Sequence, residues 1–171
     1  MFRIVIASLA ALSLAGCAHH RHHGMEMGAG MAQAAPTEPV KFSPSLPVLA
    51  SGYQKVAAPA NAAVYFISPR NGETVSSPVS VKFGLRGMGV APAGVEKAGT
   101  GHHHVLVDLA LVDVNAPLPA DGAHRHFGGG QTETSLELPP GTHTLQLILG
   151  DQNHIPHHPP VLSERITITV K

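Results

Sequence analysis

Clusters of proline and glycine interrupt the chain from about residue 62 to its end, and no other feature limits its fold as much. Pro139-Pro140-Gly141, Gly128-Gly129-Gly130 and Pro159-Pro160 cannot lie inside helices or central strands, because proline lacks a backbone donor and glycine has no side chain to pack. No stretch between these breaks shows a helical period of convincing length. We therefore expect short strands joined by tight turns.

Apolar and polar residues alternate between the breaks, as they do in strands with one buried face. In the clearest case, Val79, Val81, Phe83 and Leu85 alternate with small or polar residues. The same pattern predicts strands at residues 64–67, 104–109, 132–138, 143–149 and 165–170. Such strands must bury their apolar faces against each other. We expect an all-β fold over residues 62–171, an immunoglobulin-like antiparallel β-sandwich.

The first residues have the pattern of a bacterial lipoprotein signal peptide. Arg3 gives a basic start, residues 4–15 form an apolar run, and Leu14-Ala15-Gly16-Cys17 is the small-residue pattern that precedes a lipidated cysteine. The apolar run is shorter than the about 20 residues that span a bilayer. We expect residues 1–16 to be removed, and Cys17 to carry lipid that anchors the protein to a membrane.

This anchor would place the protein on the periplasmic side of the cell envelope. Ala18 follows the cysteine, and the sorting rule of such lipoproteins then implies the outer membrane of a Gram-negative cell. Cys17 is the only cysteine. Once it is lipidated, no thiol remains for a disulfide, a zinc-thiolate site or nucleophilic catalysis.

Residues 17–61 are rich in Ala, Pro and Gly and have no sustained apolar period, so we expect a disordered tether. Its start combines imidazole and thioether groups, which outside the cytoplasm favour copper. The alternative is a solvated tail that binds metals weakly and without purpose. The residues of this tail cluster are His19, His20, His22, His23, Met25, Met27 and Met31.

The composition argues against nucleic acid as a partner and draws attention to histidine. Eleven Lys and Arg balance eleven Asp and Glu, and tryptophan is absent, so neither a basic patch nor the usual stacking platforms are available. The chain contains 13 histidines. Because imidazole titrates near about 6.5, both surface charge and metal binding should respond to mild acid.

Several histidines have spacings that suit a metal site. His102 and His104 fall on one face of a predicted strand and can converge on one ion. His126, in a predicted loop, and His154 and His157, in a proline-stiffened turn, could meet them where loops gather. Three imidazoles with an open or carboxylate position suit zinc or copper.

A hydrogen-bonded network without metal would explain the same residues. His143 has the phase of the leucines that follow it and is expected at the edge of the core. Asp108 is expected to form hydrogen bonds at a strand end, because a regular strand places it about 13 Å from His104. The partners of such a network would be Asp108, Gln131, Glu133 or Asp151.

The chain resembles a bacterial family catalogued as domain of unknown function 4399, whose members are mostly secreted. The resemblance spans residues 64–170 and rests on motifs that include Gly101-His102-His103-His104, His126-Phe127-Gly128-Gly129-Gly130-Gln131-Thr132-Glu133, Pro139-Pro140-Gly141-Thr142-His143 and the stretch 150–157. It implies that His102, His103, His104, His126, His143, His154 and His157 belong to the family pattern. His124 and His158 do not match it, which weakens His124 and His126 as a chelating pair.

These observations leave three hypotheses. The leading one is a non-enzymatic, tethered extracytoplasmic lipoprotein that binds copper or zinc through His102, His104, His126, His154 and His157, for buffering or transfer. The second is a structural or interaction module of the cell envelope with a histidine network and no metal. The third is a cupin-like metalloenzyme, since paired histidines on a strand also occur there.

Overall fold

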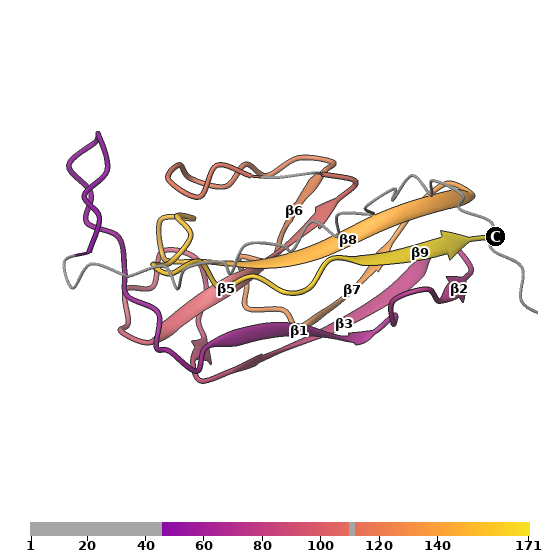
Figure 1. Cartoon of the computed structure of the whole chain (residues 1–171), viewed down its shortest axis with the longest axis horizontal. Coiled ribbons are helices and arrows are strands. Elements are labelled where there is room, and N and C mark those ends of the chain that lie inside the picture. The colour runs from indigo at the N-terminus through magenta and orange to yellow at the C-terminus, as the bar shows by residue number, and fades with distance from the viewer. Residues whose placement is uncertain (1–45, 110–111) are drawn as a thin grey trace, which may run out of the picture. The chain divides into compact units, whose positions relative to one another are not determined.

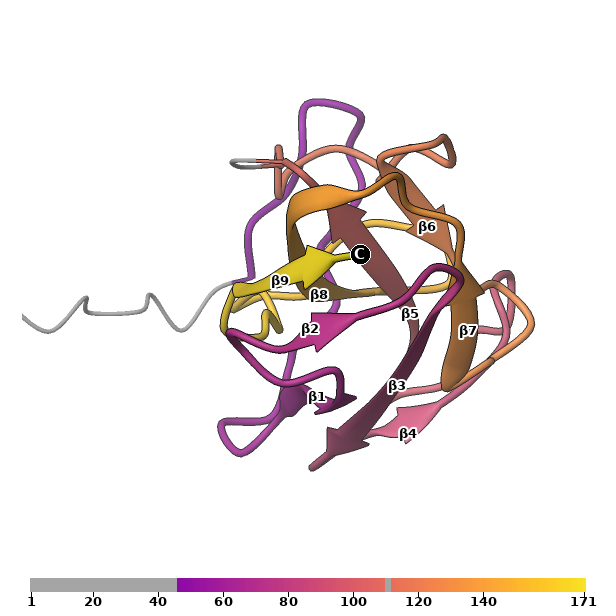
Figure 2. The same ribbon diagram turned by 90° about the vertical axis from the view of Figure 1, so that its right-hand side faces the viewer.

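Two sheets face each other in the computed structural model, which describes residues 46–109 and 112–171 (Figure 1). The smaller sheet has the strand order β1 (Ala63–Ser68), β3 (Val79–Arg86) and β7 (Glu133–Leu136). The larger sheet has the order β2 (Thr74–Val75), β9 (Ile166–Val170), β8 (Gly141–Gly150), β5 (Thr100–Val107) and β4 (Gly89–Val90), and β6 (His124–His126) also pairs with β5. Figure 2 shows both layers from the end where the chain finishes.

The core lies between the two sheets and is built by the alternation seen in the sequence. In β9, Ile166, Ile168 and Val170 are buried while the residues between them are exposed. Val81 and Phe83 of β3 pack into the same apolar cluster from the opposite sheet. The predicted all-β sandwich is confirmed, and the described residues contain no helix.

Three local features differ from the predictions. The strand expected at residues 104–109 runs from Thr100 to Val107, so three consecutive histidines lie inside it. His124–His126, expected in a loop, forms β6, which pairs with β5 although it lacks apolar alternation. The sandwich is also not entirely antiparallel, because β2 with β9 and β4 with β5 form short parallel pairs.

The folded unit begins before residue 62, within the stretch predicted to be tether. Residues 46–58, the N-terminal arm, include Lys55, which is only 2% exposed. Lys55 Nζ donates to Val114 O at 2.6 Å, and Ala57 forms a bridge with His158. Hydrogen bonds rather than apolar periodicity attach the arm, so its order has no sequence pattern of the kind that marks a strand.

Several predicted features lie outside the described residues. They are the signal peptide, the lipidation site Cys17, and the tail cluster of His19, His20, His22, His23, Met25, Met27 and Met31. Within residues 46–109 and 112–171, no helix has the length and apolar character needed to cross a membrane.

Candidate metal site

The central strand β5 places two histidines on the outer face of the larger sheet. Side chains alternate along a strand, so His103 and Val105 point between the sheets while His102 and His104 point away from the core. Residues 112–123 and the loop after β8 enclose this outer face, and His102 and His104 are both 0% exposed. His102 and His104 therefore point away from the core and are nevertheless completely buried.

Two further histidines reach the same place from different segments. His126 lies directly opposite His104 in the antiparallel pairing of β6 with β5, and residues paired in this way bring their side chains together on one face. His154 comes from the loop after β8 and has a φ of 64°. A left-handed backbone is uncommon for any residue other than glycine, and such conformations gather at functional sites. We call His102, His104, His126 and His154 the four-histidine cluster.

The rings of the four-histidine cluster lie close to one another, with centroids 4.7–5.9 Å apart, and their Nε2 atoms approach each other in two pairs. His102 Nε2 is 3.1 Å from His104 Nε2, and His126 Nε2 is 3.2 Å from His154 Nε2. Candidate ligand atoms of His102, His104 and His126 all lie within 4.8 Å of one another. Around a tetrahedral ion with bonds of about 2.0–2.1 Å, any two ligand nitrogens are about 3.3–3.4 Å apart. The separations of 3.1 Å and 3.2 Å are close to this value, and those among His102, His104 and His126 are bounded by 4.8 Å.

Burial favours the neutral form of three imidazoles of the cluster, those of His102, His104 and His126. Desolvation, followed by the charge of His154, lowers the pKa of His102 to about 4. Desolvation and the neighbouring His102 lower the pKa of His104 to about 2. The pKa of His126 is also lowered, by desolvation and then by His154. Neutral imidazole is the form that binds metal, so these three side chains are ready to bind an ion at neutral pH.

A hydrogen-bonded network explains this arrangement less well. Two neutral imidazoles that meet through Nε2 share one proton, so the accepting ring carries its own proton on Nδ1. The Nδ1 atoms of His102 and His104 are buried and have no hydrogen-bond partner among the described residues. Coordination would leave these Nδ1–H groups equally unpaired, so they do not separate the two interpretations. The gathering of all four rings, with centroids 4.7–5.9 Å apart, favours a shared ion, because a network needs only pairs.

Two glycines provide the space that the rings occupy. A Cβ added at Gly150 would lie 3.2 Å from His104 Nε2, and one added at Gly128 would lie 2.5 Å from His126 Nε2. Neither residue was singled out from the sequence. For Gly128 the sequence offers only its position two residues after His126, in a glycine run that indicates a turn or an approach site for a neighbouring backbone.

Replacing Gly128 with alanine is expected to weaken metal binding while leaving the fold almost unchanged. The added Cβ displaces the His126 ring, which can swing away, and changes beside a ligand typically cost about 10- to 100-fold in metal affinity. Zinc affinity measured by chelator competition checks this result. Gly122→Ala is the matched control, because a Cβ there meets nothing within 4 Å. Equal affinities in both variants would contradict the role given to His126.

The fifth predicted ligand, His157, lies outside the four-histidine cluster. Its Nε2 is 3.1 Å from Thr100 O and its Nδ1 is 3.4 Å from Leu149 O. Its ring therefore faces backbone carbonyl groups in a buried position, and we leave it out of the proposed ligand set. His124 also stays apart, since its Nδ1 is 2.9 Å from Asp121 Oδ1.

His143 and Asp108 form a separate pair at the edge of the core, as expected. His143 Nδ1 lies 2.7 Å from Asp108 Oδ2, and His143 Nε2 lies 2.9 Å from Pro139 O. The hydrogen bond to Asp108 raises the pKa of His143. Asp108 Oδ1 also accepts from the Thr144 amide at 2.7 Å, so each oxygen of this carboxylate has a hydrogen-bond partner outside the four-histidine cluster.

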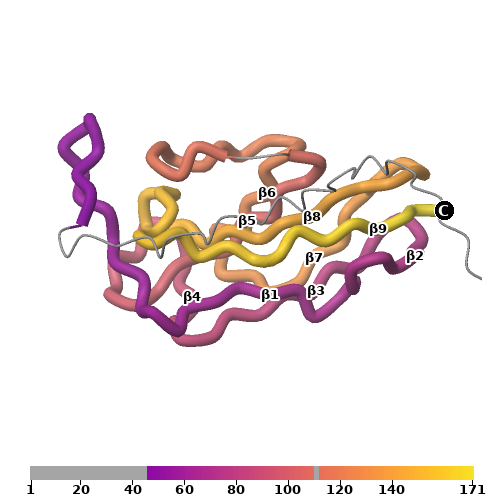
Figure 3. The backbone as a smooth tube through the Cα atoms, viewed as in Figure 1, coloured from indigo at the N-terminus to yellow at the C-terminus, as the bar shows by residue number. Residues whose placement is uncertain are grey.

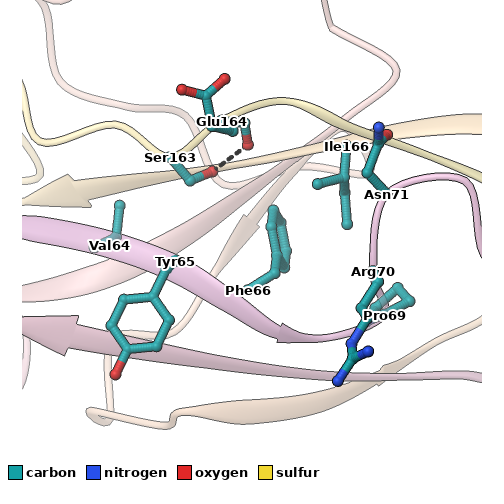
Figure 4. Close-up of a pocket in the computed structure, with 9 residues that line it drawn as sticks. All are labelled: Val64, Tyr65, Phe66, Pro69, Arg70, Asn71, Ser163, Glu164 and Ile166. Carbon is teal, nitrogen blue, oxygen red and sulfur yellow. Dashed lines mark hydrogen bonds between the residues drawn. The ribbon is translucent and has the colours of Figure 1, made fainter.

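A separate apolar hollow of about 310 Å³ lies between β1 and the chain just before β9 (Figure 4). Val64, Phe66 and Ile166 contribute its apolar surface, while Arg70 and Glu164 are also among its lining residues. None of the nine lining residues is a histidine. This hollow has no connection with the chemistry of the four-histidine cluster.

Comparison with known proteins identifies a family of unknown function and one distant structural neighbour. The sequence model of a family described as a domain of unknown function, DUF4399, matches residues 81–171, which is more than half of the chain. No curated protein shows a significant match. Among solved structures, the endo-beta-1,4-mannanase from Thermotoga petrophila is 19% identical with a TM-score of 0.38, over 65% of this chain and 20% of that chain. The chain thus spans about a fifth of that enzyme.

Proposed function

The chain belongs to the DUF4399 family, and we propose that it binds copper or zinc through its four-histidine cluster, to buffer the ion or hand it over outside the cytoplasm. One observation carries the proposal. Four histidines from three separate segments gather with their ring centroids 4.7–5.9 Å apart, and ligand atoms of three of them, His102, His104 and His126, lie within 4.8 Å of one another.

The chemistry of the cluster supports copper or zinc over other ions. Its four donors are imidazoles, and neither a thiolate nor a carboxylate belongs to it. Imidazole suits zinc, copper, iron and nickel, whereas calcium and magnesium prefer oxygen ligands. Four nitrogen donors match the coordination number that zinc prefers, and copper binds more tightly to most nitrogen sites.

The unequal exposure of the cluster supports exchange of the ion rather than a closed structural site. His102 and His104 are completely buried, whereas His126 and His154 are partly accessible to solvent. An incoming chelating group can replace the two accessible ligands while the two buried ones still hold the ion. Exported location and lipid attachment through Cys17 belong to the proposal as well, and they rest on the N-terminal sequence pattern alone.

Metal content and thermal stability test the proposed function. The protein purified without an affinity tag is expected to retain copper or zinc, measured by elemental analysis. A ligand bound only by the native state stabilises it by RT ln(1 + [L]/Kd), about 2.7 kcal/mol at a hundredfold excess over Kd. Calorimetry of the stripped protein should therefore show a higher Tm after either metal is added. A protein whose Tm is indifferent to both metals would end the metal hypothesis.

A further inference from the structure

The loop that carries His154 is organised by one buried carboxylate. Asp151 is 0% exposed. Its Oδ1 accepts from the amides of Asn153 at 2.8 Å and Ile155 at 3.0 Å, and its backbone carbonyl accepts from the His154 amide at 2.9 Å. These bonds close a tight turn with His154 at its left-handed position. The direction of the His154 ring therefore depends on where the Asp151 carboxylate is held.

The other oxygen of this carboxylate is held by the N-terminal arm. Tyr53 donates its hydroxyl hydrogen to Asp151 Oδ2 at 3.0 Å, and the same hydroxyl oxygen accepts from Gln152 Nε2 at 3.0 Å. One hydroxyl thus binds the first two residues of the loop. A buried carboxylate oxygen needs a donor, and a hydrogen bond to a charged group is stronger than a neutral one.

The arm itself is fastened firmly enough to act as a support. Backbone bonds join Ala58 N to His158 O and His158 N to Val56 O, each at 2.9 Å, so the arm runs beside the far end of the same loop. Buried Lys55 ties it to Val114. Figure 3 shows the indigo arm at the end of the sandwich where the chain turns after β8. The arm precedes residues 81–171, the part matched by the family.

We infer that Tyr53 is a positioning residue for the metal site, which holds Asp151 so that His154 faces His126. The inference rests on the proposed function and extends it to regulation of the same site. The arm sets how tightly the ion is held, because the fourth ligand is in place only while Tyr53 supports the loop. Tyr53 contacts no ligand nitrogen itself and acts through Asp151.

Tyr53→Phe in the full chain tests this inference, with zinc as the probe. Zinc affinity, measured by chelator competition, is expected to fall about tenfold, in line with other residues that support metal ligands. In the metal-free protein, the amides of Asn153 and Ile155 should exchange their hydrogens faster. Tyr65→Phe is the matched control, because Tyr65 lies on β1 with 45% of its surface exposed and should change neither measurement.

A double-mutant cycle with His154→Ala separates positioning from general destabilisation. Three histidines remain in that background, enough to bind zinc. Tyr53→Phe should then have no further effect on affinity. A full tenfold loss in both backgrounds, or wild-type affinity in Tyr53→Phe alone, would overturn the inference. If the wild type binds neither metal, the proposed function fails. The hydrogen exchange of the metal-free protein is read separately: unchanged exchange rates of the Asn153 and Ile155 amides in Tyr53→Phe would show that Tyr53 does not support the loop.

Discussion

The metal-free protein is expected to lose several kcal/mol of unfolding free energy between pH 6.5 and pH 4. Burial lowers the pKa of His102 and His103 to about 4 and that of His104 to about 2, while unfolded histidine titrates near about 6.5. Below pH 6.5 the unfolded chain therefore binds protons that the native state rejects. Stability falls as pH falls, by up to about 1.4 kcal/mol per pH unit for each of the three.

The two other described histidines with shifted pKa values do not cancel this loss. The pKa of His126 is lowered, so His126 adds to it. The hydrogen bond to Asp108 raises the pKa of His143, so its contribution is fully present below pH 6.5 and is lost only as pH rises through the raised pKa. Urea unfolding at pH 7, 6 and 5 measures the effect. His103→Leu is a useful control, because removing one of the three groups should reduce the slope by about a third. A flat profile would mean that the histidines are not buried in neutral form.

Replacing His102 and His104 together with leucine is expected to abolish the response to metal without destabilising the metal-free fold. Both side chains are completely buried, so alanine would leave cavities, whereas leucine fills similar space. Leucine also removes two buried Nδ1 atoms that lack partners, and replacing buried polar groups by apolar ones of similar shape is often neutral or stabilising. The stabilisation of about 2.7 kcal/mol by a hundredfold excess of metal should disappear.

Calorimetry with and without zinc or copper checks this result. His103→Leu is again the control, because His103 lies on the same strand but points inward, with its ring 4.8 Å from that of Phe83. Its nitrogens face the backbone of Gly84 and Gln131 without reaching hydrogen-bond geometry. This control should keep the metal response. A structural network forecasts the opposite outcome, in which the double leucine variant is less stable than the wild type and metal affects neither protein.

The core of the fold could be predicted because burial of one strand face leaves a period of two in the sequence. This period located β3 and β9 to within one residue. It could not locate β6, whose three residues depend on pairing with β5 rather than on alternation. The arm was assigned to the tether for a similar reason, since single hydrogen bonds such as those of Tyr53 and Lys55 have no periodic signature.

The parts of the candidate site that depend on one strand could be predicted from the sequence, and the parts that depend on contacts between segments could not. Alternation along one strand is enough to place His102 beside His104, and the structure brings both together with His126 and His154. The sequence does not indicate which of His154 and His157 faces the cluster, because the turn around Asp151 decides this. Whether the four-histidine cluster holds an ion stays a prediction.

The pairing of β5 on both sides has a consequence for how selective the cluster can be. Because β8 and β6 both hydrogen-bond to β5, His102 and His104 are fixed in place when the chain folds. The entropic cost of orienting these two imidazoles is therefore met during folding and not again on capture of an ion. His102 and His104 therefore form the rigid half of the cluster. The other half can adjust, because His154 lies on a loop and His126 on a three-residue strand. An ion whose radius does not suit the fixed spacing cannot be accommodated by moving that rigid half.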